Sequence, residues 1–370
     1  MGYEILPKIA SRKQMYSQLD LAINNISQEK EKKDEENTTS QRKYLKALII
    51  ESNSTINQIS PDPNIVFLPT SEEDIKILQI TRKDNISYSY LDMLDPRFWI
   101  LYSLDTSEDI KREVKHLIVK NNSRLDYAWF SSSLLQSISS RYSKTSFSMK
   151  FHNTFENENI PMKKLAIRLW AEDASEIIDN LLNNDYIGKG ACISNIEIEH
   201  RSRPDSFVKT RLSMEGSINI SNGTSVDEFL DYQQKIVQGH YKPIVEHIER
   251  DFTTNFSLNE GFSINGNLLS IKLQQKISNI ERVVNDILKG IHPFRFVGFA
   301  NKISDEDYLL NVLDLHTFSH FDLEIYPDEI FINLPQGSCG NSALRLFALC
   351  QERIDPKATL RGDGNAIIAT

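Results

Sequence analysis

The segment from Phe321 to Leu349 constrains the fold more than any other stretch of this sequence. Its pattern predicts a strand, a tight turn at Pro327-Asp328, a second strand, and then a glycine turn that opens a helix. A shorter segment, from Leu212 to Ile236, has the same order of strand, turn, strand and helix. We therefore expect two β-hairpin–helix units in one chain.

The two segments also share a string of residues, Ile-Asn-aliphatic-x-x-Gly-(Thr/Ser)-(Ser/Cys), directly before the expected helix. In this string Gly223 aligns with Gly337, and Ser225 aligns with Cys339. Ser225 and Glu228 have the spacing of a capping box, in which each side chain bonds the backbone of the other residue. The shared string predicts that the two units are a duplication.

Composition limits the classes of protein to consider. The chain has 370 residues, 25% of them charged and 40% hydrophobic, which is typical of a globular protein with one large domain or two. Its net charge of −9 argues against nucleic-acid binding over the whole surface. There is no apolar run of about 20 residues and no signal-peptide layout, so we expect a cytoplasmic protein without a membrane partner. The three cysteines show no disulfide or zinc pattern: Cys192, Cys339 and Cys350.

The order of the expected elements predicts an α+β fold with mixed or antiparallel sheets. Residues 1–43 would form an N-terminal helix and a charged linker, since residues 28–43 contain no apolar side chain. Residues 44–156 would form a strand-rich α+β subdomain. Residues 157–360 would form a C-terminal α+β domain that holds the two related units around inserted long helices, and residues 361–370 would form a tail. The apolar members of the N-terminal helix are Met15, Leu19, Leu21, Ile23 and Ile26.

One of the inserted helices is expected from Leu268 to Lys289, immediately before Gly290. Five of its apolar residues alternate at spacings of four and three: Leu273, Ile277, Ile280, Val284 and Ile287. This spacing places them on one helix face and indicates a seam for one partner helix, inside the chain or in a second copy. The seam predicts a protein partner or self-association.

Cys339 offers the sharpest possibility of catalysis. It follows Gly337-Ser338 at an expected helix start, where the positive end of the helix dipole lowers the pKa of a thiol. A thiolate nucleophile also needs an imidazole nearby, and the imidazole needs an orienting carboxylate or amide. A thiol hydrolase that uses Cys339, His320 and Asn333 is therefore one alternative function. The competing interpretation is a buried cysteine at a helix start, which the serine at the aligned position favours.

A basic cluster on two adjoining strand segments supplies another alternative. Its members are Arg201, Arg203, Lys209 and Arg211, and they follow two glutamates, Glu197 and Glu199, that we expect to be exposed. Together the cations could line a sheet face that contacts phosphates, as in a nucleic-acid-binding protein. The competing interpretation is a solvated surface.

The sequence contains neither a nucleoside-triphosphate loop nor a Rossmann glycine fingerprint. His316 and His320 fall on a turn that leads into a strand, not on one helix face, so we expect no metal and no cofactor. The favoured prediction is a non-catalytic binding or assembly component of a cytoplasmic complex. The composition, rich in isoleucine and asparagine, further suggests an accessory role in bacterial defence against mobile DNA.

Overall fold

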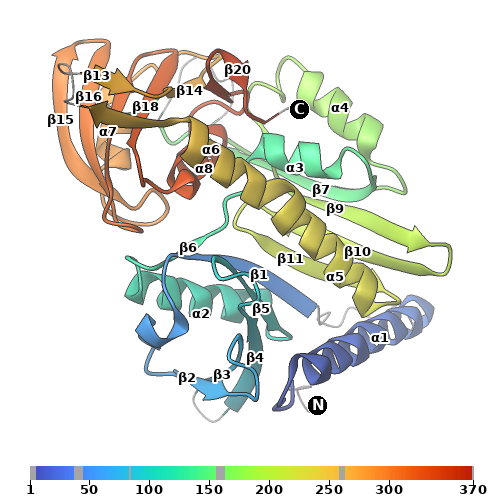
Figure 1. Cartoon of the computed structure of the whole chain (residues 1–370). Helices are drawn as coiled ribbons and strands as arrows, with labels where there is room; N and C mark the ends of the chain where they lie inside the picture. Colours follow the sequence, from blue (N-terminus) through green and yellow to red (C-terminus); the bar gives the residue numbers. More distant parts are fainter. Residues whose placement is uncertain (1–5, 37–44, 83–84, 156–162, 258–262, 369–370) are drawn as a thin grey trace. The chain divides into compact units, whose positions relative to one another are not determined.

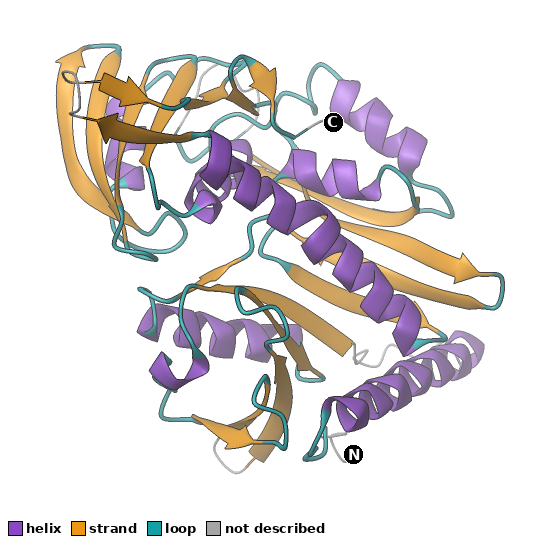
Figure 2. Ribbon diagram, in the orientation of Figure 1, coloured by secondary structure: helices purple, strands orange, loops and turns teal. Residues whose placement is uncertain are grey.

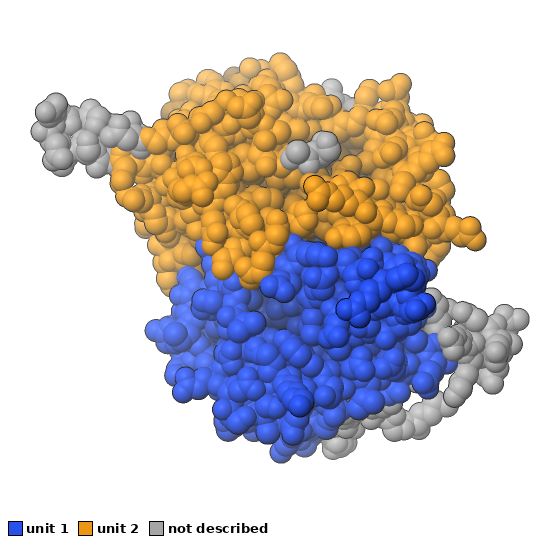
Figure 3. Space-filling model, turned by 45° about the vertical axis from the view of Figure 1, so that its right-hand side comes forward, with its two compact units in different colours: residues 1–128, 197–237 blue, residues 129–196, 238–370 orange. Residues whose placement is uncertain are grey.

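The computed structural model describes residues 6–36, 45–82, 85–155, 163–257 and 263–368, and these residues form the expected α+β fold (Figure 2). The chain forms two compact units (Figure 3). Unit 1 contains residues 1–128 and 197–237, and unit 2 contains residues 129–196 and 238–370. The chain therefore passes from one unit to the other three times, which differs from the contiguous domains expected from the sequence.

Unit 1 is built on a sheet with the strand order β2-β3-β4-β5-β1-β11-β10-β9, with β6 paired to β1 (Figure 1). Its strands are β1 (Leu45–Ser52), β2 (Ile65–Pro69), β3 (Ile75–Arg82), β4 (Asn85–Asp92), β5 (Phe98–Ser103), β6 (Leu125–Tyr127), β10 (Ser206–Ser213), β11 (Ser217–Gly223) and β9 (Cys192–Arg203) from residue 197 onward. Its helices are α1 (Arg12–Glu36), the short 3-10 helix η1 (Ile56–Gln58), α2 (Ser107–Lys120) and α5 (Val226–Gln234).

The centre of this sheet consists of β1 and β5, in which every residue is buried. The run from Phe98 to Leu104 is apolar on both faces, as is typical of a strand that is covered on both faces. Helix α1 packs against β11, and four of its five expected apolar residues are buried while Leu21 is exposed. The helix continues to Glu36, so the first part of the expected charged linker is helical, and the rest of that linker lies outside the described residues.

Unit 2 contains two sets of strands. The first has the order β9-β7-β8, and the second has the order β15-β16-β17-β18-β14-β19-β20, with β12 joined to β18 and β13 to β12. The strands are β7 (Ser143–His152), β8 (Lys164–Trp170), residues 192–196 of β9, β12 (Thr253–Ser257), β13 (Ser263–Asn265), β14 (Leu269–Lys272), β15 (Phe296–Ser304), β16 (Asp307–Asp314), β17 (His320–Ile325), β18 (Glu329–Pro335), β19 (Thr359–Gly362) and β20 (Asn365–Ala366). Pairing in the second set is antiparallel except between β12 and β18.

The helices of unit 2 are α3 (Ser132–Ser139), α4 (Ser175–Asn183), α6 (Lys242–Asp251), α7 (Ile280–Ile287) and α8 (Gly340–Arg353), and the π-helical segment η2 (Lys235–Tyr241) leads into α6. Helix α8 is buried along most of its length and packs against α6 (Figure 1). The contact is close at Gly340, where a Cβ atom would lie 2.6 Å from the Val245 carbonyl oxygen. The start of α8 is therefore held in a tightly packed position.

The two expected hairpin–helix units both form, as β10-β11-α5 in unit 1 and β17-β18-α8 in unit 2. Ser225 and Cys339 are the N-cap residues of their helices, as the alignment predicts. The aligned glycines differ, because Gly337 has a φ of +88° in an open turn while Gly223 is the last residue of β11 and lies against Ile23 of α1. Gly223 and Gly337 therefore lie in different surroundings, although the residues around them match in sequence.

The expected long helix from Leu268 to Lys289 is wrong in its first half. Residues Leu269–Lys272 form β14, and α7 begins only at Ile280. The five residues of the expected seam are all buried within the fold: Leu273, Ile277, Ile280, Val284 and Ile287. Their spacing of three and four reflects burial in a short helix and the loop before it, and they do not form an exposed seam.

Strands β15 and β16 are joined by a tight turn after Ser304. One further expectation, the C-terminal tail, needs correction. The expected tail begins inside β19, and residues Arg361 and Gly362 pair with β20. Within the described ranges, no helix is both long and apolar enough to cross a bilayer.

Candidate active site

Cys339 is placed at the start of α8 by the turn that follows β18. Gly337 adopts a left-handed backbone conformation in this turn, which glycine tolerates best, and the Ser338 N–H donates to the Pro335 carbonyl at 3.0 Å. Cys339 is the N-cap of α8, but its side chain makes no capping hydrogen bond. The carboxylate of Glu249 accepts the Gly340 N–H at 2.8 Å instead. The helix start is therefore stabilised without help from the thiol.

His316 is placed by a turn at the end of β16. The Asp314 carboxylate accepts the His316 backbone N–H at 2.9 Å, and the Asp314 carbonyl accepts the Phe318 N–H at 2.8 Å. Phe318 has a positive φ of 54°, which closes the turn. The imidazole of His316 is fully buried, at 0% exposure.

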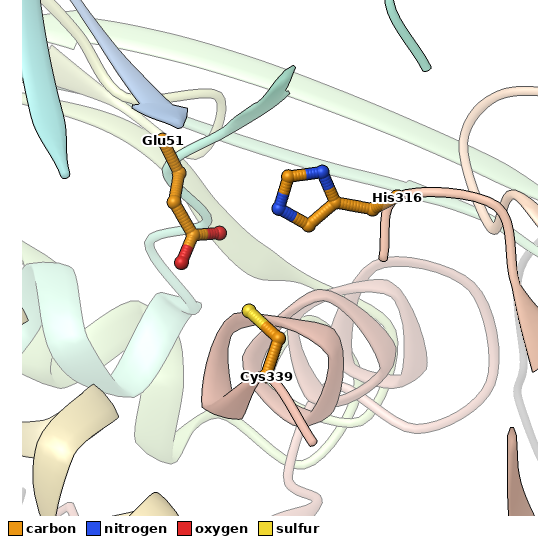
Figure 4. Close-up of side chains that lie close together, drawn as sticks. All are labelled: Glu51, His316 and Cys339. Atoms are coloured by element: carbon orange, nitrogen blue, oxygen red, sulfur yellow. The ribbon is translucent and has the colours of Figure 1, made fainter. Parts of the chain in front are cut away.

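The Cys339 thiol and the His316 imidazole lie close together in unit 2. The Cys339 Sγ atom is within 4.8 Å of a ring nitrogen of His316. Figure 4 shows the two side chains converging, one from the start of α8 and the other from the loop after β16. Cys339 is 9% exposed. The site thus brings together a thiol, an imidazole and a helix N-terminus.

A buried ion pair links the two segments that carry these side chains. The Arg345 guanidinium on α8 donates to the Asp314 carboxylate at 2.5 Å, and both residues are inaccessible to solvent. The Ser342 hydroxyl also donates to this carboxylate, and the guanidinium carbon lies 4.6 Å from the centre of the Phe296 ring. Because Asp314 also anchors the turn of His316, this network fixes that turn against the helix that begins at Cys339.

The expected partners of Cys339 lie elsewhere. His320 is exposed at the first position of β17, and the Asn333 amide oxygen accepts a hydrogen bond from Thr254 at 2.7 Å. The imidazole beside the thiol is His316, which the sequence reasoning passed over. The only local indication is Asp314 itself, since aspartate is a residue type that often accepts the backbone N–H two residues later in an Asx-turn.

The other two cysteines contrast with Cys339. Cys192 and Cys350 are fully buried, at 0% exposure. Burial raises the pKa of the Cys192 thiol to about 12, and burial also raises the pKa of the Cys350 thiol. Both thiols are therefore neutral at ordinary pH and inert toward electrophiles.

The basic cluster lies on β9 and β10 of unit 1, which are adjoining strands as expected: Arg201, Arg203, Lys209 and Arg211. Arg201 and Lys209 both pair with Glu199, at 2.6 and 3.1 Å. Arg211 pairs with Glu197 at 3.0 Å, and Glu197 is buried, contrary to the expectation that it is exposed. Three of the four cations are thus neutralised by glutamates of β9, which weakens the surface as a phosphate-binding site.

Fold and site together define an α+β protein that carries a thiol–imidazole pair at a helix start. The chain belongs to the MJECL33-like protein family, which it matches over residues 3–368. It is similar to the uncharacterised protein MJECL33 of Methanocaldococcus jannaschii, with 25% identity over 404 residues. That similarity covers 96% of this chain and 95% of the archaeal protein.

Proposed function

We propose that this protein is a thiol-dependent hydrolase in which Cys339 is the nucleophile and His316 is the general base. The observation that carries the proposal is the approach of the Cys339 Sγ atom to a His316 ring nitrogen, within 4.8 Å. Two features support it. Cys339 does not cap its own helix, and the network of Asp314 and Arg345 fixes the turn that carries the base.

The proposed chemistry follows from these two groups. His316 takes the proton of the Cys339 thiol, and the thiolate forms a bond to the carbonyl carbon of an ester or amide. The bond from that carbon to the leaving group breaks, and the leaving group departs with the proton from His316. Water, deprotonated by His316, then attacks the thioester and releases the acid and the Cys339 thiol.

Competitive alkylation tests the proposal on the intact chain. Iodoacetamide at pH 6 is expected to label Cys339 well before Cys192 and Cys350, which mass spectrometry of peptides would show. The His316→Gln variant should label Cys339 more slowly than the wild type, whereas the His320→Gln variant, which alters an exposed imidazole, should label it at the wild-type rate. Equal labelling of the three cysteines, or no labelling of Cys339, would remove the enzyme proposal.

We propose assembly through β15 as a second candidate function, in line with the protein-binding role expected from the sequence. β15 is the terminal strand of its sheet, and the part of the chain that the structure describes pairs it with β16 alone. Phe299 and Ile303 of this strand are 80% and 62% exposed. An exposed apolar edge strand is the usual surface for strand addition, and antiparallel pairing with β15 of a second copy would satisfy its backbone groups.

Light scattering during size-exclusion chromatography tests the second candidate. The chain is expected to form dimers as its concentration rises, and Phe299→Lys should shift the dimer toward monomer. Leu94→Lys serves as the control, since Leu94 is an exposed apolar residue of unit 1 outside β15. A monomer at every concentration would remove this candidate.

A further inference from the structure

A second cluster of titratable side chains lies in unit 1, and the proposed hydrolase chemistry does not use it. His200 lies on β9, and Glu228 and Asp231 lie one turn apart on α5. The His200 Nε2 atom is 3.3 Å from the Glu228 Oε2 atom and 3.2 Å from the Asp231 Oδ2 atom. All three ligand atoms lie within 4.8 Å of one another.

A hydrogen bond from the His200 Nε2 atom can serve only one of the two carboxylates at a time. The Nε2 atom of an imidazole carries at most one proton, yet it faces two carboxylate oxygens at nearly equal distances. Glu228 and His200 are both buried, so the repulsion between the two carboxylates is not fully screened by water. A cation held between the three ligand atoms would remove this repulsion.

The observed distances match those between ligands of one zinc ion. With zinc–ligand distances of about 2.0–2.1 Å, two ligand atoms of a tetrahedral site lie about 3.3 Å apart. The two nitrogen–oxygen distances of 3.3 and 3.2 Å agree with that separation. Imidazole nitrogen and carboxylate oxygen are both zinc ligands, and three protein ligands leave the fourth position for water.

Neighbouring residues hold two of the three ligands in place. The Glu228 carboxylate accepts the Ser202 backbone N–H at 3.2 Å and also accepts the Ser202 hydroxyl. The Tyr232 ring stacks on the His200 imidazole, with 5.4 Å between ring centres. Supporting contacts of this kind orient metal ligands in proteins. The Asp231 side chain is 46% exposed, which gives an ion and its water access from solvent.

We propose that His200, Glu228 and Asp231 form a binding site for a divalent transition-metal ion, with zinc the best fit. Lys235 acts against metal binding, since its ammonium group bonds the Asp231 carboxylate at 2.7 Å. Metal binding would displace this ammonium group from the Asp231 oxygen atom. We therefore expect that removal of the Lys235 charge strengthens metal binding.

Isothermal titration of the chelator-treated full chain with zinc sulfate tests the site. The wild-type chain is expected to bind zinc, and His200→Ala should lose one equivalent or bind at least about a hundredfold more weakly. The Lys235→Met variant should bind several-fold more tightly, which a purely structural ion pair would not explain. The control is His247→Ala, since His247 pairs with Asp251 on the surface of α6.

A second variant separates this site from the thiol pair, which also contains metal-binding groups. Cys339→Ser should keep the equivalent of zinc that His200→Ala loses, and cobalt bound at the His200 site should show no thiolate-to-metal absorption. Zinc binding that is unchanged in both His200→Ala and Lys235→Met would overturn the proposal. So would a wild-type chain that binds no zinc. If His200→Ala does not fold, Lys235→Met decides the question.

Discussion

Arg345 and Asp314 show how one pair of residues supports the proposed site. The pair has no access to water, and the Asp314 carboxylate also accepts a hydrogen bond from Ser342 and one from the backbone of His316. A buried charge that loses its partner retains its full cost of desolvation. The position of His316 therefore depends on a guanidinium located on the same helix as Cys339.

Arg345→Met is expected to lower the free energy of unfolding by about 3–5 kcal/mol, because it leaves Asp314 buried without its cation. Urea denaturation followed by circular dichroism measures the change. The control is Lys302→Met, which removes an exposed pair with Asp305 and should leave the urea midpoint nearly unchanged. Equal effects of the two variants would contradict the importance of the buried pair.

Lys46 gives the stability of unit 1 a defined dependence on pH. Its side chain is 3% exposed, and burial lowers the pKa of its ammonium group to about 8. Between pH 8 and the ordinary pKa of lysine, about 10.4, the unfolded chain binds more protons at this position than the folded chain. The contribution of Lys46 to stability is therefore unfavourable below pH 8 and improves as the pH rises through this window.

The free energy of unfolding of the wild-type chain should accordingly rise by on the order of 2 kcal/mol between pH 7.5 and pH 9.5, relative to that of Lys46→Met. Urea denaturation of both chains at the two pH values measures the difference. An equal change in the free energy of unfolding of the two chains between these pH values would contradict a lowered pKa of Lys46.

Sequence reasoning found the thiol but not its imidazole, and the reason is local. The position of Cys339 depends on residues next to it in the chain, namely Gly337 and a following helical pattern. The position of His316 depends on a backbone turn that the Asp314 carboxylate stabilises. That carboxylate is held by Arg345, which lies thirty-one residues later in the chain. Short-range patterns do not reveal a contact of that kind.

At the scale of elements, strands and hairpins were predicted better than helices. Runs such as Phe98 to Leu104 are apolar enough to be recognised as strands whatever surrounds them. The prediction of one helix from Leu268 to Lys289 was wrong because apolar residues three and four apart also occur when a strand and a short helix are both buried. The expected capping box of α5 has its Ser225 half, in which the Ser225 hydroxyl accepts the Glu228 N–H at 3.5 Å, while the Glu228 carboxylate accepts from Ser202.

The close packing at the start of α8 can be tested by substitution of its glycine. Gly340→Ala is expected to destabilise the chain by about 1–3 kcal/mol, because its Cβ atom would meet the Val245 carbonyl oxygen at 2.6 Å. Gly239→Ala, in the π-helical segment η2, has no atom within 4 Å of the new Cβ and should stabilise the chain by about 0.4–1 kcal/mol. Urea denaturation distinguishes the two, and equal effects would contradict the close packing of α6 and α8.

At the scale of the whole molecule, the two units are assembled from separated segments. The expected boundary near residue 156 falls between β7 and β8, which pair along the full length of β8, from Ser146 with Trp170 to His152 with Lys164. Local composition marked a polar stretch there, but pairing across that stretch joins the strands into one unit. Contiguous domains inferred from composition therefore differ from the compact units.

A fragment of residues 157–360 is expected to unfold without a cooperative transition, because β8 lacks its partner β7 and unit 2 lacks α3. The intact chain should unfold cooperatively under the same conditions. Urea denaturation followed by tryptophan fluorescence compares the two. A sharp transition in the fragment would support the contiguous boundaries and contradict this division of the chain.

The most direct test of the central claim is the pH dependence of the rate at which iodoacetamide alkylates Cys339. We expect the midpoint for Cys339 to lie below that of glutathione measured alongside, His316→Gln to move it toward the glutathione value, and His320→Gln to leave it in place. A Cys339 midpoint equal to that of glutathione, or one that is identical in the wild type and in His316→Gln, would contradict the claim.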